Sequence, residues 1–260
     1  MIALNSPETG GMAPHARIAL YFLLSACCAF NVSAQETPRK TIWDLRLGEP
    51  LSAQPDAGEY QGYACGANGG PPRQPISGFA DFARCAPEPG GLREVYFEYD
   101  DELEYIARAR DLKQELIRYV GTTEKGFPIM VSALLDQDGV LQGLRMVTDA
   151  RPDQRKDRAD SGLKSRANAY LFGGLMAGRF DIEAEVHCQK LKPEEGESAV
   201  GGTFVKLDCS KADAASKRSY KLSARFLRKP GQNGRDPRLP TRLTVGEFES
   251  SARLEIFAAP

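Results

Sequence analysis

The sequence is poor in the residue types on which most catalytic and metal sites depend. Its 260 residues include two histidines and one tryptophan, and no Cys-x-x-Cys pair occurs. His187 is the only histidine after the N-terminal segment, so a Ser-His-Asp or Cys-His enzyme would depend on this residue alone. A zinc site is disfavoured for the same reason. We therefore expect no metal and no cofactor, and we interpret His187 as an ordinary strand histidine.

Several features that would indicate a partner or a compartment are also missing. The formal net charge is −1, which excludes the strongly basic balance of a typical nucleic-acid-binding protein. No apolar run is long enough to cross a bilayer as a helix, so no transmembrane helix is expected. No motif is specific enough to indicate a family. The hydrophobic and charged fractions are 42% and 27%, which predicts an ordinary globular core.

The first 34 residues have the pattern of a secretory signal peptide. Arg17 precedes an apolar stretch that starts at Ile18, and Val32-Ser33-Ala34 ends it. A basic start, a short apolar core and small residues before the cleavage point define such a signal. The pattern predicts a signal peptide at residues 1–34 and export to the periplasm or the medium. Met12 is an alternative start, because the residues before it are unlike the basic start of a signal.

The same segment also allows a lipid anchor. Leu24-Ser25-Ala26-Cys27 is similar to the bacterial lipobox, in which the cysteine is lipidated and becomes the first residue of the mature protein. The signal would then end at residue 26, and Cys27 would attach the chain to a membrane. Cleavage after Ala34 and lipidation of Cys27 both remain open at this stage.

Four cysteines remain beyond the signal: Cys65, Cys85, Cys188 and Cys209. An even number in an exported protein favours disulfides over free thiols. Three pairings are conceivable. Cys65–Cys85 and Cys188–Cys209 are favoured, because each bridge closes a loop of about 20 residues within one local unit.

The clearest secondary-structure signals lie in the first half of the mature chain. Residues 92–99 alternate in polarity, which predicts a strand with one buried face. An apolar stripe from Leu103 to Val120 predicts an amphipathic helix. Apolar runs at residues 128–136 and 140–148 flank an Asp-Gly pair and predict a hairpin. Residues 41–47 are expected to form a strand or a tight initial segment.

The second half is predicted to contain one more helix and several strands. A charged segment starts near residue 151 and leads into a helix that stops near Gly178. Its buried face is expected to carry Leu163, Ala167, Tyr170, Leu171, Leu175 and Met176. Alternating residues in 180–191, 202–209, 220–227 and 244–257 predict a β-meander.

Together these elements predict an α+β fold, with antiparallel β-sheet, two packed amphipathic helices and a β-meander in the C-terminal third. The expected organisation is an α+β unit at residues 35–150, a charged linker with the second helix at residues 151–179, and a β-rich unit at residues 180–260. The first and last of these units could also form one continuous domain.

Six acids within eleven residues form the first candidate site: Glu94, Glu98, Asp100, Asp101, Glu102 and Glu104. Paired carboxylates can perform acid–base chemistry or hold calcium. Helix capping and the solvated face of the strand explain several of these acids, however, and the spacing of a calcium loop is absent. We favour a structural interpretation and keep a hydrolase based on Glu98 and Asp101 as an alternative.

The glycine- and proline-rich loop at residues 66–75 is the second candidate. Its backbone N–H groups could bind an anion, but the Lys-Ser/Thr pair of a phosphate-binding loop is missing and the prolines remove donors. We favour a surface loop inside the first disulfide ring.

The basic segment from Lys211 to Arg242 is the most suggestive feature. It holds ten Lys and Arg against Asp213 and Asp236, a local charge of +8. Four of the ten are expected on one loop: Arg228, Lys229, Arg235 and Arg238. They can bind an anion or a partner. Alternatively, the segment pairs with the acidic residues at 88–104 or is simply solvated.

Three functions follow from these features. The first is a non-enzymatic exported protein that binds an envelope component or an acidic protein face through its loops and basic segment. The second is an exported hydrolase that depends on carboxylates. The third is a structural lipoprotein held to a membrane through Cys27. Nucleic acid is not expected as a partner, and the sequence does not indicate an oligomeric state.

Overall fold

The computed structural model describes residues 41–54, 60–98, 123–124, 127–149, 168–232, 235–236, 239–243 and 248–259. All of them belong to one compact unit, Lys40–Pro260. The signal peptide with Cys27, the helix predicted over Leu103–Val120, the charged segment near residue 151 and Arg238 lie outside the described residues.

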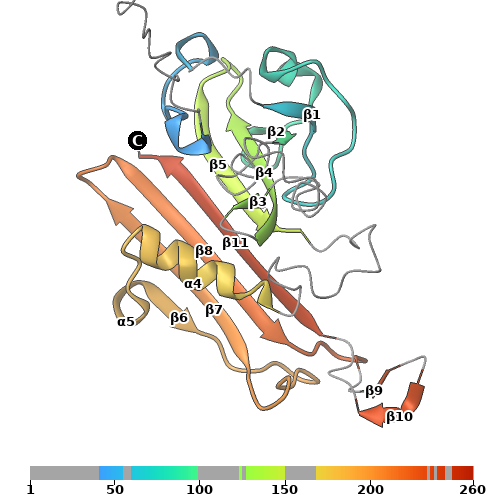
Figure 1. The fold of residues 1–260 in the computed structure, drawn as a ribbon. Coiled ribbons are helices and arrows are strands. Elements are labelled where there is room, and N and C mark those ends of the chain that lie inside the picture. Colours follow the sequence, from blue (N-terminus) through green and yellow to red (C-terminus); the bar gives the residue numbers. More distant parts are fainter. Residues whose placement is uncertain are drawn as a thin grey trace, which may run out of the picture. The chain divides into compact units, whose positions relative to one another are not determined.

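Nine strands of the described chain pair in one antiparallel sheet (Figure 1). Their order is β1-β2-β4-β5-β11-β8-β7-β6, and β3 pairs with β4 beside this path. The strands are β1 (Gln61–Cys65), β2 (Arg93–Glu98), β3 (Thr123–Glu124), β4 (Phe127–Leu135), β5 (Leu141–Thr148), β6 (Cys188–Lys190), β7 (Val205–Asp213), β8 (Arg218–Leu227) and β11 (Glu249–Ala258). A separate pair is formed by β9 (Arg235–Asp236) and β10 (Leu239–Leu243).

The predicted antiparallel sheet is therefore confirmed. The last strand, β11, pairs with β5 on one side and with β8 on the other. Strands from the first and last thirds of the chain consequently share one hydrogen-bonded sheet, and β11 occupies its centre (Figure 1).

The hairpin predicted around the Asp-Gly pair is confirmed as β4 and β5. The Asp136 carboxylate accepts hydrogen bonds from the backbone N–H groups of Asp138 and Val140. Gly139 adopts a φ of 75°, a backbone conformation that glycine reaches without steric cost. These two features fix the turn and with it the register of the hairpin.

The predicted pair of packed amphipathic helices is not confirmed. The helices of the described residues are short: η2 (Ile42–Asp44), η3 (Leu51–Ala53), η4 (Phe79–Arg84), α4 (Leu171–Arg179) and α5 (Ala184–His187). In α4 the expected buried face is wrong at Leu171 and Leu175, which are exposed, while Phe172 and Met176 are buried. The reason is Gly173, which turns toward the sheet so closely that an added Cβ would lie 3.0 Å from Ala224 Cβ.

The strand expected at residues 180–191 is corrected in part, and of the two alternatives for residues 41–47 the structure has the tight initial segment. Of the strand expected at residues 180–191, the structure keeps Cys188–Lys190 as β6, while Ala184–His187 forms the turn of α5. Asp181 has a φ of 50°, which an extended strand does not permit. At the start of the fold, Thr41 caps the 3-10 turn η2, whose Asp44 carboxylate accepts a hydrogen bond from Thr41 N.

Strand β2 is buried on both faces, not on one as predicted. Val95 and Phe97 belong to the main core, which lies on the sheet face covered by α4. Tyr96 points to the other face, where it packs with Ala64 and Met130. The sheet is thus covered on both sides around β2, and polar residues of β2 are removed from water as well.

Candidate functional site

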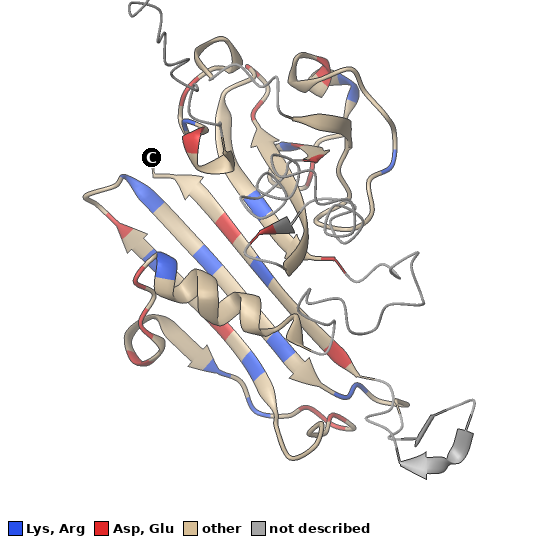
Figure 2. Cartoon of the chain, viewed as in Figure 1, with Lys and Arg blue, Asp and Glu red and all other residues tan. Residues whose placement is uncertain are grey.

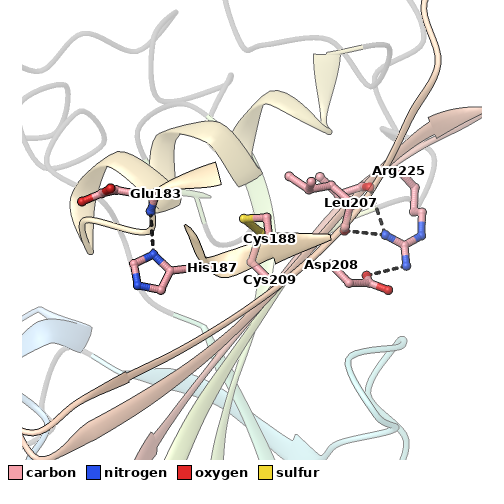
Figure 3. Close-up of a disulfide and its surroundings, with 8 residues drawn as sticks. Glu183, His187, Cys188, Leu207, Asp208, Cys209 and Arg225 are labelled. Carbon is pink, nitrogen blue, oxygen red and sulfur yellow. Dashed lines mark hydrogen bonds and ion pairs between the residues drawn. A yellow bond between two sulfur atoms is a disulfide. The ribbon is translucent and has the colours of Figure 1, made fainter. Parts of the chain in front are cut away.

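The two disulfides of the described chain pair the cysteines that the loop lengths favour. Cys65 is bonded to Cys85, and Cys188 to Cys209. Cys188 and Cys209 lie directly opposite each other on β6 and β7, so this bridge joins the edge strand β6 to its neighbour β7 (Figure 3). The Cys65–Cys85 bridge instead closes the loop that covers β1.

The two edges of the sheet differ in how far other parts of the chain cover them. At the β1 edge, backbone hydrogen bonds from Arg73 to Cys65, from Cys65 to Gln74 and from Ile76 to Tyr63 cover the strand with a loop. At the other edge, β6 is three residues long and pairs with Leu207, Asp208 and Cys209 of β7. The remainder of β7, from Ser210 to Asp213, pairs with β8 on its inner side and has no strand on its outer side among the described residues.

The backbone of β7 shows which of its groups face this edge. Leu191 N donates a hydrogen bond to Lys206 O, so Lys206 directs its backbone groups toward β6. Backbone groups alternate in direction along a strand, and Ser210 and Ala212 therefore direct their N–H and C=O groups to the same side. Within the described chain these groups have no backbone partner, and both residues are exposed. Unpaired edge groups of this kind are a template for another strand.

The sheet face that α4 leaves uncovered is polar near this edge. Ser210, Lys221 and Glu255 lie directly opposite one another on β7, β8 and β11, so their side chains share a face. A neighbouring row on the same face holds Gln189, Asp208, Ser223 and Arg253. Figure 2 shows the resulting bands of charge on β8 and β11.

A groove of about 610 Å³ opens over these rows and reaches the sheet edge. Its lining combines the polar face with the turn of α5: Val186, His187, Cys188, Gln189, Asp208, Cys209, Ser210, Lys221, Leu222, Ser223, Arg253 and Glu255. Val186 and His187 of α5 and Ser210 of β7 line the outer end of the groove. This end therefore lies at the open edge of β7. The groove and the open edge form one continuous candidate site.

Most charges in the groove are already compensated by neighbours. Arg225 donates to the Asp208 carboxylate at 2.6 Å (Figure 3). Glu255 lies opposite Lys221, yet its carboxylate is engaged at 2.7 Å by both Arg145 and Arg253. Lys221 forms no ion pair within the described chain; its ammonium lies 5.7 Å from the centre of the Phe257 ring. Lys221 is therefore the cation that the groove offers to a ligand.

The cation that holds Glu255 belongs to a buried cluster next to the groove. The side chain of Arg145 on β5 is 5% exposed and lies 2.9 Å from the Glu94 carboxylate, which is 3% exposed. The same guanidinium binds Glu88 through two nitrogens, at 2.6 and 3.0 Å. With Arg253, the cluster contains two cations and three carboxylates, and it connects β2, β5 and β11.

This cluster overturns the interpretation of Glu94 as a solvated residue. It also changes the interpretation of the glycine-rich loop, because the backbone N–H groups of Asn68 and Gly69 donate to the Glu94 carboxylate. The loop does bind an anion through its backbone, but the anion is a side chain of the same protein. Gly66 permits this approach, since a Cβ there would lie 2.3 Å from the Glu94 carboxyl carbon.

The cluster perturbs the protonation of its members. The hydrogen bond from Arg145 is the main cause that lowers the pKa of Glu88, although partial burial opposes it. For Glu255 burial acts to raise the pKa, but the hydrogen bonds and charges of Arg145 and Arg253 outweigh it and lower the pKa. The carboxylates in turn raise the pKa of Arg145 against the effect of burial. All three groups are therefore held in their charged forms.

His187 is not a strand residue as predicted but the last residue of α5. Its Nδ1 accepts a hydrogen bond from the backbone N–H of Glu183 at 2.9 Å (Figure 3). A neutral imidazole in this arrangement carries its proton on Nε2, which is then a donor at the rim of the groove. The hydrogen bond arises because the chain makes a helical turn here instead of continuing as a strand.

The four cations predicted to bind a partner have different positions. Arg228 donates to Ala199 O at 2.6 Å, and Lys229 pairs with Glu249 at 2.7 Å. Arg235 lies on β9, and Arg238 is outside the described residues. Glu88 and Glu94, two of the acids with which the basic segment was alternatively expected to pair, bind Arg145, which lies outside that segment. The binding role of the four cations stays a prediction.

Of the other predicted acids, Glu98 alone lies among the described residues. Glu98 accepts a hydrogen bond from the Tyr96 hydroxyl at 3.2 Å, and Asp101 lies outside the described residues. No group of three or more metal-ligating side chains is found in the part of the chain that the structure describes. None of the described helices has both the length and the apolar character needed to cross a bilayer.

Comparison with protein-family models, with curated proteins and with solved structures finds no match. The groove is therefore interpreted from its own chemistry.

Sequence reasoning counted Lys221 in the basic segment without singling it out, and it missed Arg253, Glu255 and Arg145. A signal for Arg145 was present, because a charged residue between Leu144 and Met146 in an apolar strand is either paired or buried at a cost. The partners of Arg145 could not be identified in this way, since Glu88, Glu94 and Glu255 are brought to it by strand register.

Proposed function

We propose that this chain is an exported, non-enzymatic binding protein that holds an extended acidic segment of a partner protein at the open edge of β7. Strand addition to a sheet edge uses main-chain hydrogen bonds for affinity and side-chain contacts for specificity. The observation that carries the proposal is the combination of unpaired backbone groups at Ser210 and Ala212 with the uncompensated charge of Lys221.

The geometry explains why the partner segment would be acidic. A partner residue placed opposite Ser210 would be about 10 Å from Lys221 across two strand spacings. Its side chain would share the face of Ser210 and Lys221. Because Ser210 is small, no side chain on β7 separates the Lys221 ammonium from a carboxylate at that position, and an extended lysine and glutamate bridge such a distance together.

The chemistry of the groove supports binding over hydrolysis. The carboxylates that line it are engaged by arginines, Asp208 by Arg225 and Glu255 by Arg145 and Arg253. A general acid or base needs a carboxylate that can exchange a proton with substrate near neutral pH. Lowering the pKa of Glu255 moves it away from that condition.

Export is supported by the disulfides together with the N-terminal pattern. Structural disulfides persist in oxidising compartments such as the periplasm, and the described chain holds two of them. The partner would then be another exported or envelope protein. Lipid attachment through Cys27 remains the alternative to a free exported chain and would place the same groove at a membrane surface.

The test measures binding of a fluorescent ten-residue peptide of alternating glutamate and threonine to the folded chain by anisotropy. Its lysine–threonine counterpart is the charge control. We expect the acidic peptide to bind more tightly than the basic one by about tenfold or more, and the preference to weaken with salt.

The backbone contribution is tested with Ala212→Pro. This substitution removes an N–H group that faces the edge and leaves the hydrogen bonds between β7 and β8 in place. Ala212→Thr keeps the N–H group and serves as the matched control. Loss of binding in the proline variant alone supports strand addition. Equal binding by wild type and both variants would refute it.

A further inference from the structure

The two disulfides have different surroundings. Cys65 and Cys85 are 8% and 2% exposed and belong to the main core. Cys209 is 5% exposed, but its partner Cys188 is only partly buried and lies on the last strand of the sheet (Figure 3). A thiolate in solution therefore reaches the sulfur of Cys188 more easily than any other disulfide sulfur described here.

Apart from this bridge, the segment that carries β6 is weakly attached. No residue of α5 is buried, and Gln189 and Lys190 of β6 are exposed. Strand β6 is held by its pairing with Asp208 and by the adjacent hydrogen bond from Leu191 N to Lys206 O. Firm attachments follow on each side of it, at the buried Ile182 and at the Lys206–Glu197 ion pair of 2.9 Å.

We propose that Cys188–Cys209 is a thiol-exchange site that controls how much of the β7 edge is open. For its effect on partner binding, this inference rests on the function proposed above. Reduction detaches β6 while Ile182 and Glu197 keep the loop tethered. The open edge then grows from residues 210–213 to residues 208–213, because the backbone N–H and C=O groups of Asp208, which face Gln189, lose their partner.

The co-reactant is a dithiol. One thiolate of the dithiol attacks Cys188 Sγ, breaks the Sγ–Sγ bond and releases Cys209 as a thiolate, leaving a mixed disulfide on Cys188. The second thiol of the reagent, as a thiolate, attacks the reagent's own sulfur in that mixed disulfide and releases Cys188. The dithiol is oxidised to a cyclic disulfide, and two electrons and two protons pass to the protein as two thiols.

The first test uses dithiothreitol on the folded full chain, followed by alkylation and peptide mass spectrometry. We expect Cys188 and Cys209 to be labelled about tenfold faster than Cys65 and Cys85. Amide hydrogen exchange should rise at Asp208, whose N–H faces β6, and stay fast at Ser210, which is already open. Equal labelling of both pairs, or an unchanged Asp208 amide after reduction, would overturn the inference.

The second test measures the acidic peptide against the Cys188→Ser/Cys209→Ser double variant, which has the released edge without any reductant. Two further ladder hydrogen bonds should strengthen binding by about tenfold. Unchanged affinity would overturn the control of binding by this disulfide while leaving the proposed function intact. If neither protein binds the peptide but Asp208 exchange rises on reduction, the proposed function fails and the release of β6 stands. Dimerisation of the double variant would show that a second copy occupies the longer edge and would contradict an acidic partner there.

Discussion

Arg145 and Glu94 form an ion pair of 2.9 Å between side chains that are 5% and 3% exposed. The pair lies next to the groove, and Arg145 also holds Glu255, the residue opposite Lys221. By engaging Glu255, Arg145 leaves the charge of Lys221 uncompensated. A buried structural cluster thus determines the electrostatics of the exposed site beside it.

Replacing Arg145 should destabilise the fold strongly. In Arg145→Met the buried Glu94 carboxylate loses its cation, and breaking a buried pair on one side costs about 3–5 kcal/mol. We expect a fall of about 3 kcal/mol in the free energy of unfolding, since Glu88 at the rim of the cluster can still be hydrated. Urea denaturation monitored by circular dichroism measures it.

The matched control is Arg225→Met, which breaks the more exposed pair with Asp208. Its cost should stay below about 1 kcal/mol. If both variants were equally stable, Arg145 would not be the centre of a buried charge cluster.

The same cluster should make the fold sensitive to acid. The pKa values of Glu88 and Glu255 are lowered in the folded chain, so as the pH falls through the unfolded pKa of about 4.3 the unfolded chain takes up protons before the folded one does. This stabilisation is complete above that pH and is lost as the pH falls through the folded pKa values. Urea midpoints at pH 7, 5, 4 and 3 should be level at first and then decline.

Glu255→Gln should flatten this decline, because one of the titrating groups is removed. A decline just as steep in the variant would assign the acid sensitivity to other carboxylates, such as Asp136, whose pKa is also lowered.

Two adjacent glycines in α4 should respond in opposite ways to alanine. An added Cβ at Gly174 meets no atom within 4 Å, so Gly174→Ala should stabilise by up to about 1 kcal/mol through helix propensity. At Gly173 the added Cβ would lie 3.0 Å from Ala224 Cβ, and forcing α4 off the sheet should cost about 1–3 kcal/mol. Thermal unfolding of both variants checks the signs, and a stabilised Gly173→Ala would contradict the close packing of α4.

The features that local interactions determine, namely the hairpin and the disulfide pairs, were predicted from the sequence. The β4–β5 hairpin follows from its Asp-Gly turn, and the disulfide pairs follow from short loops. The buried face of α4 was not predicted correctly. A hydrophobic pattern places the large apolar residues Leu171 and Leu175 on the buried face, whereas the helix packs on the sheet through Gly173.

The site depends on register, which the sequence does not reveal. Lys221, Glu255 and Arg145 come from three strands far apart in the chain and meet in one row only because β11 lies between β8 and β5. The open edge of β7 likewise results from the turn of α5, where an alternating pattern had predicted a continuing strand. Composition indicated a positive segment but not which of its cations lacks a partner.

The most direct test of the proposed function is a reversal of charge at Lys221. The measurement is the ratio of dissociation constants for the glutamate–threonine and lysine–threonine peptides, compared between wild type, Lys221→Glu and Lys190→Glu. Lys190 is exposed on β6, and its side chain points to the opposite face of the sheet, so it controls for net charge. The wild type and Lys190→Glu should prefer the acidic peptide, and Lys221→Glu should lose or reverse that preference. A preference for the acidic peptide that survives in Lys221→Glu would contradict the assignment of this groove as the binding site.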